Sequence, residues 1–401
     1  MAVDNKPMER YARLMATCFY GIFFGLCWLF FYRMVYHGVA IQAHIKFAES
    51  LAAGIKLIPH LGYFYILWFF KVITALSWRM AAAFLLSIFA TLNAMAVHFV
   101  FKRCLPGYST AVLLGLTAIT MTVAAIYVPF FNKAIYFGQG SPNMWHNSTV
   151  IAVKAISILT FYMAINLIEN RANQHSWKYI GSTAALMALS VFIKPTFMIV
   201  LLPAVGLYIL FKHRKEFDIY WKITITALPA IGLMLYQYIN LYSGRELGVH
   251  GVQRTSELDI LTVWRMFTPN VFVSILITIA FPLAVLVFRY RSVIKNNYLI
   301  AAWIAMIAGM LQFALFAEHD MAGRVIRSAN WIGGYLIGLT LVFVFTMPEF
   351  ANWLKGSDYR DRIENSKIWF TSILLALHTF SGFCYIYDLL INGRTAFIFY
   401  T

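Results

Sequence analysis

The sequence predicts an all-α, polytopic membrane protein, because its composition leaves too little polar surface for a fold in water. Of its 401 residues, 61% are hydrophobic and only 12% are charged, whereas about a quarter of an average soluble domain is charged. The aromatic share of 17% adds further apolar area. The same figures exclude a disordered chain, which needs low apolar content and high charge. We therefore expect a single transmembrane domain over residues 1–401.

Apolar stretches of sufficient length define the expected spans. A helix needs about 20 apolar residues to cross the hydrocarbon core, and about eleven stretches come close to that length. They lie near 17–36, 79–101, 110–131, 149–168, 178–193, 196–211, 219–241, 269–288, 298–316, 330–347 and 368–387. The first is predicted as an uncleaved span, because it lacks the small-residue cleavage pattern of a signal peptide. The stretch 61–77 carries Lys71 and is either a twelfth span or a helix lying in the membrane interface.

Positive charge predicts the orientation. The net charge is +16, and Lys and Arg lie in short clusters between apolar stretches, as in the cytoplasmic loops of membrane proteins. This pattern argues against nucleic acid as a partner and favours membrane lipids. The clusters are Lys6/Arg10/Arg13, Lys102/Arg103, Arg171/Lys178, Lys212/Arg214/Lys215, Arg289/Arg291/Lys295 and Lys355/Arg360/Arg362/Lys367. All fall on one side if 61–77 does not cross, so we expect a cytoplasmic N-terminus and an external C-terminus.

The expected outer loops hold most of the remaining polar residues, and they are 37–78, 132–148, 242–268 and 317–329. In the first loop, Gln42, Lys46 and Glu49 share one helical face opposite apolar residues, which predicts a juxtamembrane helix over 42–54. Glu49 is its only carboxylate. It is either a general base toward an acceptor hydroxyl or the exposed partner of Lys46. Further along, His60 either binds phosphate or lies at the interface.

The second outer loop combines turn, aromatic and capping residues. Its candidates for binding a sugar or a sugar phosphate are Gln139, Asn143, Trp145 and His146. Asn147 or Ser148 can cap the helix that follows, and the N–H groups and dipole at a helix N-terminus favour an anion. The alternative is a capped turn between two helices with an interfacial tryptophan.

The loop 318–330 places two acids, two arginines and a histidine at the mouth of a span. Arg324 and Arg327 have the planar fork that holds a diphosphate in bidentate fashion. Glu318 and Asp320 either contribute to the chemistry or pair with these arginines and fix the loop.

Other polar residues are less informative. Lys194 lies between two short spans and either reaches a phosphate or only accompanies the end of a helix. The outer carboxylates are too scattered to predict a metal site from spacing, which leaves a divalent ion as an open question. The four cysteines show neither disulfide nor zinc spacing.

These motifs resemble those of the GT-C glycosyltransferases, membrane enzymes that take sugars from polyprenyl-phosphate carriers on the outer face. Bacterial surface-polysaccharide assembly proteins look most similar. The resemblance covers the whole chain in topology, and its local motifs are His44-Ile45-Lys46-Phe47-Ala48, Pro59-His60, Gly140-Ser141-Pro142-Asn143-x-Trp145-His146-Asn147 and Glu318-x-x-x-x-Gly323-Arg324 with Asn330. One position departs from the pattern, because Ala40 stands where such proteins carry a first-loop acid. Another acid then substitutes, or the reaction runs without a strong base.

The resemblance implies an enzyme of the bacterial inner membrane that needs no cofactor. It would transfer a sugar or glycan from a polyprenyl phosphate or diphosphate carrier to a glycan or lipid-linked acceptor, in O-antigen, capsule or exopolysaccharide synthesis, as a transferase or as a polymerase. The implied catalytic residues are Glu49, Glu318 and Asp320, and the implied substrate-binding residues are His44, His60, Gln139, Asn143, Trp145, His146, Lys194, Arg324, Arg327 and Asn330. The alternative is a transporter or flippase of the same lipid-linked glycan, which should have broken helices around a midplane site.

Overall fold

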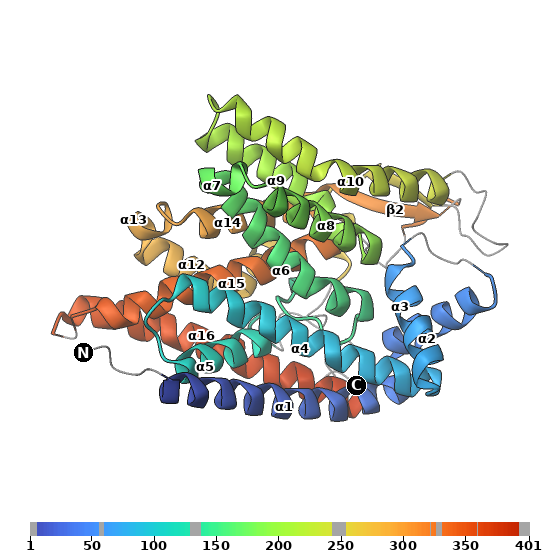
Figure 1. The fold of residues 1–401 in the computed structure, drawn as a ribbon, viewed down its shortest axis with the longest axis horizontal. Helices are drawn as coiled ribbons and strands as arrows, with labels where there is room; N and C mark the ends of the chain where they lie inside the picture. Colours follow the sequence, from blue (N-terminus) through green and yellow to red (C-terminus); the bar gives the residue numbers. More distant parts are fainter. Residues whose placement is uncertain are drawn as a thin grey trace.

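The computed structural model describes residues 6–55, 60–128, 138–242, 254–320, 322–325, 331–358 and 360–392. Within these ranges the protein is a bundle of helices packed side by side (Figure 1). Eight helices are long and apolar enough to cross a membrane, so the prediction of a multi-pass membrane protein is confirmed. They are α1 (Lys6–His37), α4 (Trp78–Cys104), α6 (Ser148–Glu169), α10 (Phe217–Tyr242), α12 (Val271–Phe288), α14 (Asn297–Leu315), α15 (Ile332–Gly356) and α16 (Arg362–Asn392).

Shorter helices fill the remaining positions. The longer of them are α2 (Val39–Ala52), α3 (Gly62–Thr74), α5 (Thr110–Thr122), α8 (Trp177–Ile193) and α9 (Thr196–Lys212), and the one-turn helices are α7 (Arg171–Gln174), α11 (Thr262–Arg265) and α13 (Tyr290–Val293). The 13 residues of α3 extend about 20 Å, less than the roughly 30 Å of the hydrocarbon core. That length favours the interfacial alternative for the stretch 61–77.

One predicted span is interrupted. The stretch 110–131 is helical only as far as Thr122, where Val123 turns to an extended conformation. The chain continues without helix, and its backbone bonds to neighbouring helices: Ala124 donates to the carbonyl of His378 at 3.1 Å and Ile126 to that of Ile277 at 3.2 Å. A Cβ atom placed on Gly382 of α16 would lie 1.6 Å from the Thr122 carbonyl oxygen. A glycine is therefore required where α16 meets the end of α5.

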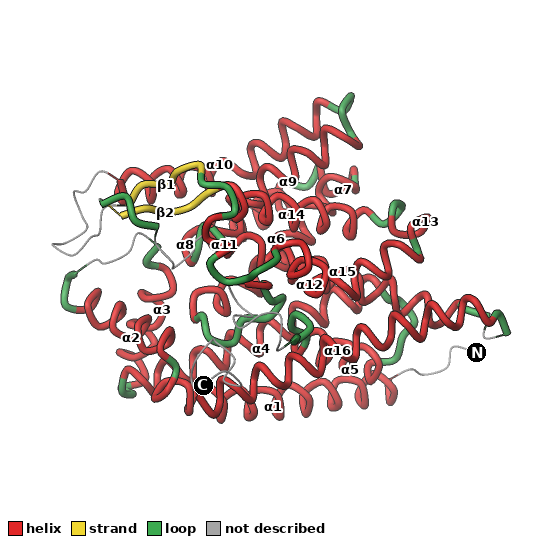
Figure 2. The backbone as a smooth tube through the Cα atoms, turned by 180° about the vertical axis from the view of Figure 1, so that it is seen from behind, coloured by secondary structure: helices red, strands yellow, loops and turns green. Residues whose placement is uncertain are grey.

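A two-stranded sheet departs from the all-α prediction. Strands β1 (Arg254–Leu258) and β2 (Phe316–Asp320) pair antiparallel, with Ser256 opposite Glu318. Figure 2 shows the strands at the same end of the bundle as α2 and α3. Two further backbone bonds, from Asp259 to Leu315 and from Leu261 to Ala314, fix this register. Strands of five residues in separate loops were too short and too distant in sequence to be recognised beforehand.

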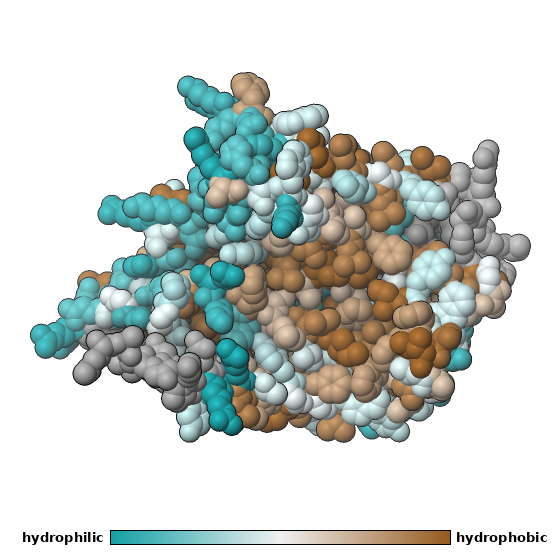
Figure 3. Space-filling model, in the orientation of Figure 1, coloured by the Kyte–Doolittle hydropathy of each residue, from teal (hydrophilic) through white to brown (hydrophobic). Residues whose placement is uncertain are grey.

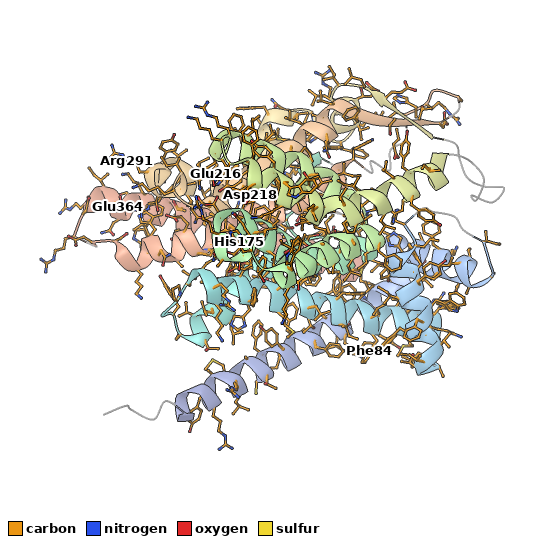
Figure 4. All side chains as sticks on the ribbon, turned by 45° about the horizontal axis from the view of Figure 1, so that its top comes forward. Phe84, His175, Glu216, Asp218, Arg291 and Glu364 are labelled. Carbon is orange, nitrogen blue, oxygen red and sulfur yellow. The ribbon has the colours of Figure 1, made fainter. Side chains whose placement is uncertain are left out.

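The two ends of the bundle differ in charge. Lys102 and Arg103 close α4, Lys212 closes α9 and Lys355 lies in the last turn of α15. These helix ends lie on the left in Figure 1, and hydrophilic side chains gather there in Figure 3 while apolar side chains cover the middle. Acidic Glu216, Asp218 and Glu364 are on the same side, together with Arg291 (Figure 4). We name this the basic end, and we name the end that carries α2, α3 and the strands the far end.

Helix α15 forms the centre of the bundle, and every residue of its most apolar stretch is buried. Glycines bring it close to α14, because a Cβ on Gly338 would lie 2.5 Å from the Cα of Met306 and one on Gly309 would lie 2.6 Å from the carbonyl carbon of Gly334. Small residues of this kind let helix backbones approach each other in membranes, where dispersion contacts are a main source of association.

Helix α6 is tied to its neighbours at the basic end. The carboxylate of Glu169 accepts hydrogen bonds from the Tyr208 hydroxyl at 2.5 Å, from His213 Nε2 at 2.9 Å and from the Asn297 amide at 2.5 Å. These bonds join α6 to α9, to the residue that follows α9 and to α14. These bonds fix the C-terminal end of α6 relative to α9 and α14, and through the rigid helix they also limit movement of its N-terminal end.

We expect Gly382→Ala to lower the melting temperature of the protein, because a Cβ atom at this position displaces the backbone at Thr122. Overpacking of this kind costs about 1–3 kcal/mol. Gly115→Ala in α5 is the matched control, since a Cβ there meets no atom within 4 Å. Thermal unfolding of both variants in detergent, followed by tryptophan fluorescence, measures the difference. Equal melting temperatures for the two variants would contradict the close contact.

Candidate functional site

The described part of the second outer loop, residues 138–147, lies inside the bundle. Gln139 is 1% exposed and Asn143 is 2% exposed. The carbonyl of Gln139 accepts hydrogen bonds from Thr278 Oγ1 at 2.8 Å and from the Tyr335 hydroxyl at 3.3 Å, and Trp264 Nε1 donates to the Gly138 carbonyl at 2.8 Å. The backbone carbonyls of Gln139 and Gly138 are thus occupied by the protein itself, whereas the side-chain oxygen of Gln139 is buried without a hydrogen-bond partner among the described residues. Substrate binding by Gln139 and Asn143 stays a prediction.

A buried lysine holds this loop against the end of α5. Lys154 of α6 donates to the Pro142 carbonyl at 3.1 Å and to the Asn143 side-chain oxygen. The Asn143 amide in turn donates to the carbonyls of Thr120 and Val123, both at 2.8 Å. These carbonyls belong to the interrupted end of α5 and would otherwise lack partners. Lys154, the chief mid-span charge in the sequence, therefore serves the connection between α5 and α6.

The start of α6 has the capping arrangement that the sequence predicted. The side-chain oxygen of Asn147 accepts the backbone N–H of Val150 at 3.3 Å, so Asn147 is the N-cap. Just before it, His146 is 4% exposed and forms a hydrogen bond with the Tyr385 hydroxyl of α16. Trp145 packs against the rings of Phe30 and Phe31, with centroids 5.8 Å and 6.3 Å away. Its ring is part of an aromatic cluster with α1.

Four predicted ligand-binding residues converge on the start of α6, and we name them the His–Lys cluster: His44, His60, His146 and Lys194. They come from α2, from the residue pair before α3, from the loop before α6 and from the connection between α8 and α9. Lys194 Nζ donates to Thr149 Oγ1, in the first turn of α6, at 3.0 Å. His44, His60 and Lys194 each keep a minority of their surface accessible.

A glycine brings two of these segments together. A Cβ atom on Gly62 would lie 2.3 Å from the carbonyl oxygen of Phe192, so only glycine allows the start of α3 to touch the end of α8. This contact places His60, two residues before Gly62, next to the segment that carries Lys194. The absence of a side chain at Gly62 therefore allows His60 and Lys194 to lie near each other.

The electrostatics of the cluster are those of an unneutralised positive site. Burial and, to a smaller extent, the charge of Lys194 together lower the pKa of His44, His60 and His146 to about 3. Burial also lowers the pKa of Lys194 to about 8. At neutral pH the histidines are thus uncharged while Lys194 is mostly protonated. Within the described ranges, no carboxylate is among the charges that shift these four pKa values.

A buried imidazole nitrogen of the cluster lacks a hydrogen bond to the described residues. His44 Nδ1 is buried and has no partner among the residues that the structure describes. Its ring contacts the rings of Tyr63 and Phe64, with centroids 6.4 Å and 5.9 Å away. A buried polar atom left without a partner is uncommon in native proteins and indicates a group kept for a ligand, a solvent molecule or a reaction.

Helix α2 has the predicted amphipathic arrangement, but its acid faces away from the packed side. Ile41, Ile45 and Ala48 are buried, whereas Lys46 and Glu49 are exposed. The residue of α2 that joins the cluster is His44. The assignment of Glu49 as a general base stays a prediction, and its exposure favours the surface alternative.

The described part of the predicted loop 318–330 forms a local turn next to β2, in which Arg324 folds back onto Asp320. Arg324 Nε and its terminal nitrogen both lie 2.8 Å from Asp320 Oδ2, and the Arg324 side chain is 80% exposed. Backbone and side-chain hydrogen bonds from Arg324 lower the pKa of Asp320. Glu318 lies on β2 opposite Ser256, while Arg327 and Asn330 lie outside the described residues. The geometry favours pairing of Asp320 with Arg324 over a free diphosphate clamp.

The sequence did not identify every residue of the site. Tyr63, Thr149 and Tyr385 contact members of the His–Lys cluster. Tyr63 and Thr149 lie just after two of the quoted motifs but outside them, and Tyr385 lies in an apolar helix with no motif around it. Within the described part of the chain, no group of three or more His, Cys, Asp or Glu side chains is arranged to hold a metal ion.

Comparison with known proteins adds no identification. No protein-family model matches the chain, and no curated protein is significantly similar to it.

The three neutral histidines predict that the unliganded protein loses stability in acid. Their folded pKa of about 3 lies below the ordinary value of 6.5. Between these values the unfolded chain binds more protons, so stability rises with pH in this window and falls as the pH drops through it. We expect the melting temperature to decrease between about pH 7 and about pH 5, and His60→Gln to reduce that dependence. The control is His175→Gln, at an exposed position. An equal pH dependence in both variants would contradict the burial of a neutral His60.

Arg324→Lys is expected to leave activity nearly unchanged, because a lysine retains the exposed ion pair with Asp320, and exposed pairs contribute little to stability. A bidentate contact to a substrate diphosphate would not survive the same change. Transport or transfer of a lipid-linked glycan in reconstituted vesicles, normalised to the amount of inserted protein, provides the measurement. Loss of activity in Arg324→Lys at normal abundance would instead support a bidentate contact between Arg324 and the substrate.

Proposed function

We propose that this protein is a GT-C-type glycosyltransferase that acts on a polyprenyl phosphate or diphosphate donor at the far end of the bundle. The observation that supports the proposal is the His–Lys cluster at the N-terminus of α6, where Lys194 lies 3.0 Å from Thr149 and no described carboxylate offsets its charge. Helix N-termini with nearby cations are suited to phosphate. The product would be a glycan or a lipid-linked oligosaccharide of a bacterial surface polysaccharide.

The proposed chemistry places leaving-group stabilisation at the cluster. As the bond between the sugar and the phosphate breaks, negative charge grows on the phosphate oxygens, and fixed donors in a poorly hydrated site stabilise that charge strongly. Lys194 supplies a charged donor, and the imidazoles of His44, His60 and His146 supply neutral N–H donors. The acceptor base stays open between Glu49, Glu318 and Asp320, because Glu49 is exposed and Asp320 pairs with Arg324.

The proposed topology extends the eight long helices to eleven crossings. The additional crossings would be α8, α9 and the combination of α5 with the buried segments 123–128 and 138–147. The basic end would face the cytoplasm of a bacterial inner membrane, and the N-terminus would lie there too. This orientation is supported by Lys102, Arg103 and Lys212 at helix ends of that side, following the positive-inside rule.

We expect Lys194→Met to reduce sugar transfer by about 100-fold or more, the loss typical when a donor to a developing oxyanion is removed. The assay uses proteoliposomes with a panel of undecaprenyl phosphate- and diphosphate-linked hexoses and follows incorporation into acceptor. Lys46→Met is the matched control, because it removes a lysine from the exposed face of α2 at the same end. Full activity in Lys194→Met would refute the proposal that the cluster binds the donor.

A lipid-linked glycan transporter is the second candidate, and one observation favours it. Helix α5 is interrupted at Thr122, and the non-helical segment after it bonds to the middle of α16 at His378. Interrupted helices of this kind line substrate sites at the membrane midplane in many transporters. In the same proteoliposomes, movement of the lipid-linked glycan between leaflets without any new glycosidic bond would favour transport over transfer.

A further inference from the structure

We infer that the His–Lys cluster takes up a proton when it holds a phosphate dianion, the form that the carrier phosphate adopts once its sugar has left. The inference rests on the proposed function, because it concerns the terminal phosphate monoester that sugar transfer from the lipid-linked donor releases. The proton comes from solvent and forms an N–H bond on an imidazole nitrogen, and no other bond forms or breaks.

The charge balance of the cluster leads to this inference. A phosphate monoester carries about 1.5 to 2 negative charges at neutral pH, because its second pKa is near 6. The site offers Lys194 and the partial positive charge of the α6 N-terminus, roughly half an elementary charge. One protonated imidazole would supply the balance. Three imidazoles lie near enough to Lys194 for its charge to affect them.

His44 is the best-placed proton acceptor of the three. Its Nδ1 is buried without a partner among the described residues, whereas His146 Nδ1 already bonds to Tyr385. In the empty site, burial and the charge of Lys194 hold the pKa of His44 down. A bound dianion reverses the sign of the local charge, which favours the protonated form of a neighbouring imidazole.

Other ionisable groups on the surrounding elements do not supply the same response. On α2, Lys46 and Glu49 are exposed on the opposite side. Two arginines on helices near the cluster have other partners: Arg33 on α1 donates to the Leu390 carbonyl, and Arg79 on α4 lies over the Tyr36 ring. The remaining ionisable groups are Tyr63 and Lys71 on α3 and Tyr385 and Asp388 on α16. None of these is an imidazole.

The imidazoles on the same helices are His37, exposed at the end of α1, His98 on α4, which bonds to Tyr20, and His378 on α16, which bonds to the Ala124 carbonyl. None of the three is among the charges that shift the pKa values of the cluster, and the His44→Gln variant assigns the proton directly.

The inference is tested by calorimetric titration of the full-length protein in nanodiscs with farnesyl phosphate, in buffers of different ionisation heat. We expect uptake of close to one proton per ligand at neutral pH, and binding that weakens by up to about tenfold per pH unit as the pH rises. Inorganic phosphate is the second ligand, and it distinguishes recognition of a free phosphate from that of a lipid phosphate. Farnesyl sulfate, which does not titrate in this range, separates protons taken up by the protein from those taken up by the ligand.

Two variants assign the protons. His44→Gln is expected to lower the uptake while retaining binding, and His175→Gln, at an exposed site at the basic end, is expected to leave it unchanged. Binding of farnesyl phosphate with no proton uptake by the wild-type protein would overturn the inference, and so would equal uptake in both variants. Farnesyl sulfate carries a single negative charge and is therefore expected to bind with much less proton uptake; uptake equal to that of the phosphate would also overturn it. Sugar transfer measured on the same preparations distinguishes failure of the proton-uptake inference from failure of the proposed function. Transfer without proton uptake leaves the proposed function standing, whereas absence of both binding and transfer removes it.

Discussion

The structure depends on one constraint: backbone without helical hydrogen bonds, in 123–128 and 140–147, lies inside a helix bundle and has to find other hydrogen-bond partners. In a membrane such backbone is tolerated only where protein groups or an aqueous cavity replace the missing helical hydrogen bonds. Here the segment after α5 bonds to the backbones of α12 and α16, and Asn143 supplies donors to two carbonyls at the end of α5. Lys154 then holds Asn143 and the Pro142 carbonyl from the neighbouring helix.

This arrangement also determines where the candidate site can be. Because the loop 138–147 is buried, α6 begins inside the bundle, with its first N–H groups and its Asn147 cap surrounded by protein. Glu169 fixes the other end of the same helix. The first turn of α6 is therefore a rigid platform, and Lys194 reaches it from the connection between α8 and α9. Burial there is also what keeps His44, His60 and His146 neutral.

The sequence predicted the parts of the molecule that depend on local pattern. The amphipathic helix with His44, the cap at Asn147 and the long apolar helices all follow from spacing and residue type, as observed. The interruption after Thr122 did not, because residues 110–131 are mostly apolar and the partners of the non-helical backbone, His378 and Ile277, come from distant helices. The approach of His60 to Lys194 could not be predicted from local pattern either, since it depends on Gly62 meeting a carbonyl of a helix more than a hundred residues away.

The distribution of acids bears on mechanism. The exposed Glu49 and the paired Asp320 leave neutral imidazoles, rather than carboxylates, as the bases beside Lys194. In the proposed transfer reaction such a site would stabilise a departing phosphate through Lys194 and would take the proton of the acceptor hydroxyl on an imidazole nitrogen. Such a site suits a donor whose leaving group is already activated, as a lipid diphosphate is. It also explains how Ala40 could stand at the position of a first-loop acid, because a reaction driven by departure of the leaving group needs less assistance from a base.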